Sequence, residues 1–170
     1  MTTKSNLLKK FRIVLCKTSH AGNIGSVARA MKTMGFSDLY LVNPKDFPSD
    51  HANALSCGAE DILRKANVVS SLGAALKDIN HVIGFTARKR ELTQPHKNVR
   101  ELSEQLINEA SDNSIAIIFG NETNGLSNIE LQQCQTLGFI DASLKYSSLN
   151  LAHSVQIVCH EIRMMSNLPF

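Results

Sequence analysis

The chain has 170 residues, of which 43% are hydrophobic, and this is enough for one domain to bury a core without disulfide or metal support. The four cysteines are scattered and form no C-x-x-C pair, so we interpret them as small buried hydrophobes in a reducing compartment. No apolar run resembles a membrane span or a secretory signal, which predicts a cytoplasmic protein without membrane partners. The net charge of +3 permits a polyanionic partner but does not require one.

Six short aliphatic or β-branched runs predict strands, at residues 11–16, 39–42, 67–70, 81–86, 115–119 and 137–142. Segments of helical period separate these runs. The alternation predicts an α/β fold with a mostly parallel sheet and helices on both faces. Ligands bind such sheets at the carboxyl ends of the strands, so we expect functional residues directly after strands.

The clearest helices follow the first strand and close the chain. The first is predicted between Asn23, which suits an N-cap, and Gly35, which suits a C-terminal stop, and its apolar face comprises Ile24, Val27, Ala28, Met31 and Met34. The last carries apolar residues at alternating steps of four and three from Leu151 to Met165. A helix with so broad an apolar surface must be covered on more than one side.

The loop FGNETNGLS joins the strand at 115–119 to a short helix predicted by a capping-box pattern. Gly120 and Gly125 allow the backbone to approach a ligand closely, and Glu122 places a carboxylate at the carboxyl end of the strand. An ordinary glycine turn with a solvated glutamate explains this segment equally well.

The segment YSSLNLAH joins the last predicted strand to the last helix. Ser147 or Ser148 is explained by a simple N-cap role. Alternatively, these hydroxyls and the free N–H groups of the helix start form a polar rim that suits a ribose, a carboxylate or a phosphate. His153 is interpreted as a packed or surface histidine rather than a base.

Two groups of cations are candidates for contact with RNA phosphates. Arg29 lies opposite the apolar face of its helix, so it is either a solvated arginine or a planar fork offered to a phosphate. Arg88, Lys89 and Arg90 follow a predicted strand, where they bind RNA backbone or merely solvate a loop.

The sequence contains no G-x-G-x-x-G, Walker A, G-x-S-x-G or H-E-x-x-H motif, so nicotinamide, ATP and metal-hydrolase functions lose support. It does contain three segments in order: HAGNIGSVARAMKTMGF from His20, FGNETNGLS from Phe119, and YSSLNLAHSVQIVCHEIRM from Tyr146. Together these resemble the three motifs of the SPOUT class of RNA ribose 2′-O-methyltransferases. They are most similar to the TrmJ type, which methylates cytidine or uridine at position 32 of the tRNA anticodon loop. The resemblance runs from Phe11 to Met165.

The resemblance implies a SPOUT fold with a C-terminal trefoil knot and S-adenosylmethionine as methyl donor, without a metal. It places the donor, in a bent shape, against Phe85, Thr86, Ala87, Gly120, Ile140, Ser147, Ser148 and Leu149. It assigns catalysis to Arg29 with Ser148 and Asn150 at the acceptor, and support of the motifs to Asn23, Glu122 and Gly125. RNA contacts are implied for Arg29, Arg88, Lys89 and Arg90.

The resemblance also implies a homodimer through the first and last helices, with Arg29 in a site shared between subunits, and tRNA as the partner. We expect one SPOUT domain over residues 1–170, without the C-terminal RNA-binding extension usual in the TrmJ type. That departure leaves open rRNA or another tRNA site as the substrate. Two other functions stay open: a non-catalytic RNA-binding SPOUT domain, and a generic doubly wound enzyme acting on a small phosphorylated metabolite.

Overall fold

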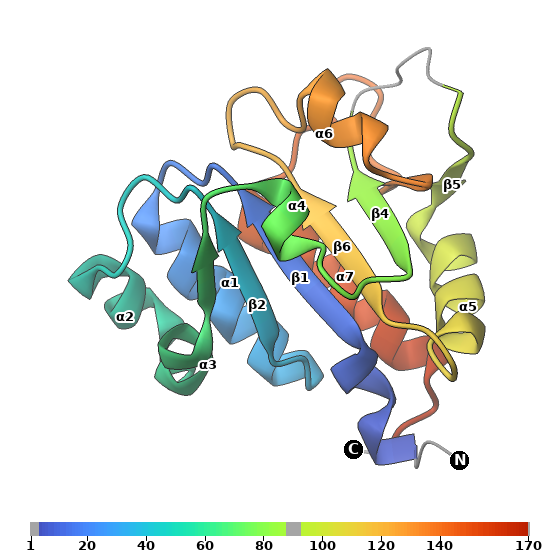
Figure 1. Cartoon of the computed structure of the whole chain (residues 1–170), viewed down its shortest axis with the longest axis horizontal. Coiled ribbons are helices and arrows are strands. Elements are labelled where there is room, and N and C mark those ends of the chain that lie inside the picture. Colours follow the sequence, from blue (N-terminus) through green and yellow to red (C-terminus); the bar gives the residue numbers. More distant parts are fainter. Residues whose placement is uncertain (1–3, 88–92, 170) are drawn as a thin grey trace.

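Seven parallel strands form one sheet in the computed structural model, which describes residues 4–87 and 93–169 (Figure 1). Their order is β3-β2-β1-β6-β4-β7-β5. The strands are β1 (Phe11–Cys16), β2 (Asp38–Val42), β3 (Asn67–Val69), β4 (His81–Phe85), β5 (His96–Asn98), β6 (Ile115–Phe119) and β7 (Thr136–Phe139). The predicted parallel sheet is confirmed, although β7 ends earlier than predicted and β5 was not predicted.

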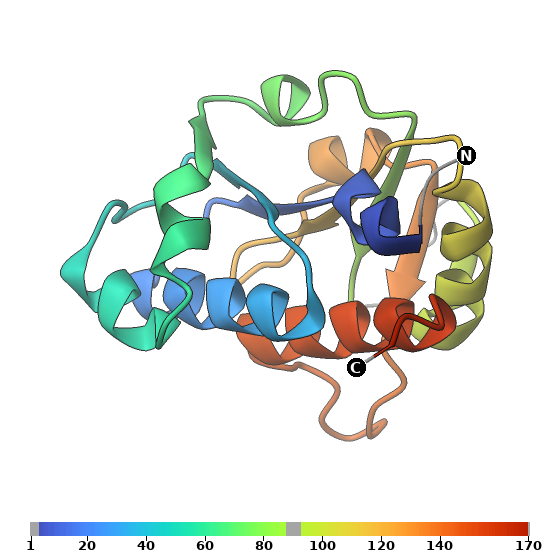
Figure 2. The ribbon, with the colours of Figure 1, turned by 90° about the horizontal axis from the view of Figure 1, so that it is seen from below.

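Helices cover both faces of the sheet, as predicted (Figure 2). The helical segments are η1 (Lys4–Lys10), α1 (Ala21–Met34), α2 (Asp50–Ser56), α3 (Glu60–Lys65), α4 (Leu72–Ala75), α5 (Val99–Glu109), α6 (Asn128–Gln132) and α7 (Leu151–Met165). The helices α1 and α7 lie side by side in one layer, with α5 beside α7. The short helices α4 and α6 lie on the opposite face.

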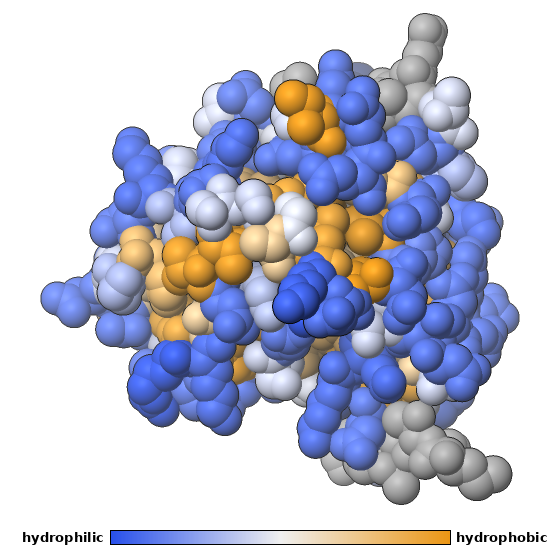
Figure 3. All heavy atoms as spheres, viewed as in Figure 1, coloured by the Kyte–Doolittle hydropathy of each residue, from blue (hydrophilic) through white to orange (hydrophobic). Residues whose placement is uncertain are grey.

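The central strands supply core residues to both layers because successive side chains point to opposite faces. In β1, Ile13 and Leu15 belong to the core beneath α1 and α7, whereas Val14 and Cys16 belong to the core beneath α4 and α6. The second core is thinly covered, and hydrophobic side chains are visible at this surface in Figure 3. Its partly buried members include Val69, Leu76 and Ile79.

One predicted helix cap is wrong, and one of the two explanations left open for Ser147 and Ser148 is excluded. Asn23 lies inside α1, which begins at Ala21 and has His20 at the N-cap without a side-chain cap bond. Likewise, neither Ser147 nor Ser148 caps α7, because Asn150 occupies the N-cap and its side chain accepts from the first amides. In contrast, Gly35 ends α1 in the left-handed conformation, and the capping box of α6 is present, as predicted.

The apolar surface of α7 is covered within the chain. Val155, Val158 and Ile162 are at most 1% exposed, and the helix packs against α1 and α5. The prediction that this helix is covered on more than one side is therefore confirmed, and the homodimer stays a prediction. The trefoil knot stays a prediction. Within the described residues, no helix has the length and apolarity needed to cross a membrane.

Candidate functional site

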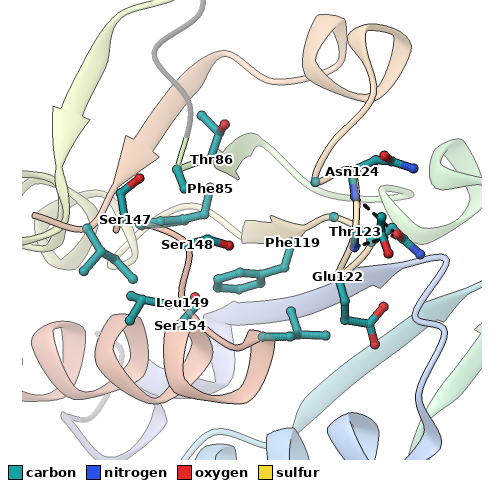
Figure 4. Close-up of a pocket in the computed structure, with 16 residues that line it drawn as sticks. Phe85, Thr86, Phe119, Glu122, Thr123, Asn124, Ser147, Ser148, Leu149 and Ser154 are labelled. Atoms are coloured by element: carbon teal, nitrogen blue, oxygen red, sulfur yellow. Dashed lines mark hydrogen bonds between the residues drawn. The ribbon is translucent and has the colours of Figure 1, made fainter. Parts of the chain in front are cut away.

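A pocket lies where β4, β6 and β7 end, beside the start of α7 (Figure 4). All eight residues that the resemblance assigned to the methyl donor line it, from three segments far apart in the chain. The described lining residues are Phe85, Thr86, Ala87, Phe119, Gly120, Asn121, Glu122, Thr123, Asn124, Gly125, Ile140, Ser147, Ser148, Leu149, Leu151 and Ser154. The expectation that strand ends build the site holds for this pocket.

One wall of the pocket is aromatic. The rings of Phe85 and Phe119 stack with centroids 5.5 Å apart and an interplanar angle of 16°. Both side chains are buried, so the stack is held rigidly by the core below it. We had not predicted Phe119 as a site residue, because it ends a strand whose residues all read as core.

The loop after β6 needs glycine at its first position. A Cβ on Gly120 would lie 2.1 Å from the carbonyl carbon of Gly125 and from the backbone nitrogen of Leu126. The loop folds back on itself because the amide of Gly125 donates to the carbonyl of Asn121 at 2.8 Å. The Asn121 side chain holds the turn further, since its Oδ1 accepts from the amide of Thr123 at 2.9 Å.

Glu122 points away from the serines of the pocket and toward the start of α1 (Figure 4). Its carboxylate accepts from the amide and hydroxyl of Ser19, at 2.9 and 2.8 Å, and from the amide of His20 at 3.1 Å. It also accepts from Nδ2 of Asn23 at 3.0 Å. A carboxylate from a distant loop therefore takes the place of a local N-cap on α1.

These contacts keep Glu122 ionised. Partial burial by itself would raise the pKa of Glu122, but the hydrogen bonds from Ser19 and Asn23 outweigh it and lower this pKa to about 2. The same carboxylate is 3.8 Å from Nδ1 of His20, an exposed ring. Glu122 thus acts as a fixed anion that ties the loop after β6 to α1.

Asn150 connects α7 to the same cluster. Its Oδ1 accepts from the amides of Ala152 and His153, at 2.8 and 3.3 Å, and its Nδ2 donates to Oδ1 of Asn23 at 3.1 Å. The three sequence motifs therefore meet through hydrogen bonds at one end of the pocket.

Of the predicted cations, only Arg29 lies within the described residues, and it lies outside the pocket. Arg29 is exposed on α1 and is absent from the described residues that line the pocket. Arg88, Lys89 and Arg90 fall outside the described residues, and their RNA contacts stay predictions. Ser154, which we did not predict, lines the pocket from α7. The one feature of the sequence that could have indicated it is that it is a polar residue in an otherwise apolar helix.

A sequence model of the SpoU rRNA Methylase family matches residues 10–160, which is most of the chain and includes all three motifs. The chain belongs to this family. This membership confirms the resemblance to SPOUT methyltransferases, and it leaves no support for a generic doubly wound enzyme.

Known proteins are similar to this chain in sequence, in fold or in both. The tRNA (cytidine/uridine-2'-O-)-methyltransferase TrmJ of Photorhabdus laumondii is 50% identical over 93% of this chain and 66% of its own length. The crystal structure of a probable methyltransferase from Bordetella pertussis has a TM-score of 0.89 at 34% identity, covering 95% of this chain and 99% of that one. AviRb from Streptomyces viridochromogenes, solved with AdoMet, shares the fold alone, with a TM-score of 0.71 and 21% identity over 92% of this chain and 60% of that one. The chain spans just under two thirds of the TrmJ relative, and its assignment as one domain over residues 1–170 stays a prediction.

Proposed function

We propose that this SpoU-family protein transfers a methyl group from S-adenosylmethionine to a ribose 2′-hydroxyl of tRNA, at position 32 of the anticodon loop, in the cytoplasm. The observation that carries the proposal is the pocket: the eight residues that the resemblance assigns to the methyl donor line a single cavity. The TrmJ relative supports the tRNA substrate and the choice of cytidine or uridine.

The pocket suits the proposed donor chemically. The Phe85–Phe119 stack offers an apolar wall to a flat base, while the hydroxyls of Ser147 and Ser148 can give polar contacts. When bound, the donor supplies a methyl group already activated by its positive sulfur. No residue of the chain then needs to form a covalent bond with the methyl group.

The remaining requirement is to place and activate a 2′-hydroxyl, which is a poor nucleophile. Alignment of the two reactants removes much of the barrier, and a nearby cation stabilises the developing alkoxide. We assign that cation to Arg29, with Ser148 and Asn150 on the acceptor side. Because Arg29 lies outside the pocket of its own chain, we propose a homodimer in which Arg29 serves the pocket of the other copy.

A panel of unmodified tRNA and rRNA transcripts tests the reaction and the substrate together. Isothermal titration must first detect binding of S-adenosylmethionine, and labelled methyl groups must then reach a ribose that nuclease mapping places at position 32. Absence of donor binding would refute the proposal. RNA binding that is unaffected by donor, with no transfer to any transcript, would favour a non-catalytic RNA-binding domain, while transfer to rRNA or another tRNA site would correct the substrate only.

A further inference from the structure

The hydrogen bonds that join α7, α1 and the loop after β6 have only one possible direction. Glu122 is a carboxylate and can only accept, so Asn23 must present Nδ2 to it and Oδ1 to Asn150. The amides of Ala152 and His153 can only donate, so Asn150 must present Oδ1 to α7 and Nδ2 to Asn23. The carboxylate at one end of this series of hydrogen bonds and the backbone amides at the other end therefore fix the orientation of the side-chain amides of Asn23 and Asn150. We refer to Asn150, Asn23 and Glu122, in this order, as the relay.

The relay connects parts of the site that have different tasks. Glu122 belongs to the loop that lines the donor pocket, and Asn150 caps the helix that completes it. Asn23 belongs to α1, which also carries Arg29 about 9 Å further along the helix axis, at 1.5 Å per residue. Neither Asn23 nor Asn150 is among the described residues that line the pocket.

We propose that Asn23 is a positioning residue that fixes α1 relative to the donor pocket of its own chain by accepting from Asn150 and donating to Glu122, and that it thereby holds Arg29 in place for the pocket of the other copy. The inference rests on the proposed methyl transfer for its catalytic consequence. It also changes the role of Asn150, whose side chain is already committed to α7 and to Asn23. Asn150 then acts through Asn23 rather than on the acceptor.

The substitution Asn150→Asp separates capping from the relay. An aspartate still accepts from the first amides of α7, where a negative charge is favourable, but it cannot donate to Asn23. A neutral hydrogen bond of this kind contributes about 0.5–1.5 kcal/mol, which is equivalent to roughly a 2- to 10-fold change. We expect the single-turnover transfer rate to fall by this factor with saturating donor and RNA, while the donor Kd changes less than about twofold.

A double-mutant cycle with Asn23→Ala decides between the relay and direct contact of Asn150 with the acceptor. If Asn150 acts through Asn23, Asn150→Asp has no further effect on the rate in the Asn23→Ala background. An equal loss in both backgrounds, or no loss in either, would overturn the inference. Asn98→Asp makes the matching N-cap change on α5, away from the relay, and must leave the rate unchanged.

A polarity reversal offers a rescue. In Glu122→Gln, the side-chain amide of the glutamine can donate to Oδ1 of Asn23. Asn23 then turns its Nδ2 toward position 150, where an aspartate can accept from it. Because glutamine can present either its oxygen or its amide to Asn23, Asn150→Asp should lower the transfer rate less in the Glu122→Gln background than in the wild type. The rescue is partial because the amide of His20 loses its acceptor. An equal loss on Asn150→Asp in both backgrounds would count against the relay.

Hydrogen exchange tests the relay independently of activity. Loss of the bond from Asn150 should speed amide exchange at the start of α1, around Ser19 and His20, and leave α5 unchanged. If the wild-type chain binds no donor, the proposed function fails, and faster exchange in Asn150→Asp would still support the relay. Unchanged exchange would refute it, whatever the activity.

Discussion

The charge of Glu122 should stabilise the fold, and Glu122→Gln removes it with little change in shape. Glutamine keeps one carbonyl acceptor for the four donors that now share two carboxylate oxygens. The fall of the Glu122 pKa from 4.5 to about 2 is equivalent to roughly 3–4 kcal/mol of folded-state stability, at about 1.4 kcal/mol for each pH unit. The side chain is 13% exposed, so solvent screens this contribution only in part. We expect Glu122→Gln to lower the free energy of unfolding by about 2–3 kcal/mol at pH 7.

The pH dependence of this difference has a definite sign. A carboxyl group whose pKa is lower in the folded state contributes fully above its unfolded value, near 4.5, and loses the contribution as the pH falls toward about 2. Urea unfolding at several pH values between 7 and 2.5 should show the wild type approaching the variant in stability. Glu104→Gln on the exposed side of α5 is the matched control and should track the wild type. A difference between wild type and Glu122→Gln that is the same at pH 7 and pH 3 would refute the reasoning.

Three further predictions follow from the site and the core. Gly120→Ala should abolish donor binding in calorimetry and lower the Tm, because its Cβ meets backbone at 2.1 Å, whereas Gly73→Ala has open space and should do neither. Arg29→Ala should keep donor affinity and lose most methyl transfer, whereas the control Lys32→Ala on the same helix should keep both. Unchanged turnover in Arg29→Ala would show that Arg29 is only a solvated arginine. A thiol reagent should label Cys57 rapidly in the native protein and the others only on unfolding, since burial raises the pKa of Cys16 and Cys134 to about 12 and that of Cys159 further. Fast labelling of more than one thiol would contradict the buried core.

The sequence predicted the sheet well because buried parallel strands are short apolar runs, and these have few alternative explanations. It missed β5, which consists of His96, Lys97 and Asn98 at the edge of the sheet. A three-residue polar strand has no periodicity to detect, and its pairing with β7 depends on the neighbouring strand rather than on its own side chains. The position of the pocket was predictable in part, since several of its residues follow the ends of β4 and β6, whereas the assignment of these residues to the methyl donor comes from the resemblance and stays a prediction.

The helix starts were less predictable, because the sequence shows only local caps. At α1, local sequence rules predict Asn23 as the N-cap. In the structure the distant Glu122 provides the acceptor for the amide of His20, and the side chain of Asn23 donates to Glu122 instead of capping the helix. At α7, two serines compete in the sequence with Asn150, which forms the cap through Oδ1 and also donates from Nδ2 to Asn23. Each motif therefore has an adequate local explanation when taken alone. The role of Asn23 depends on two partners, 99 and 127 residues away along the chain, and only the folded arrangement determines which end of its amide faces which partner.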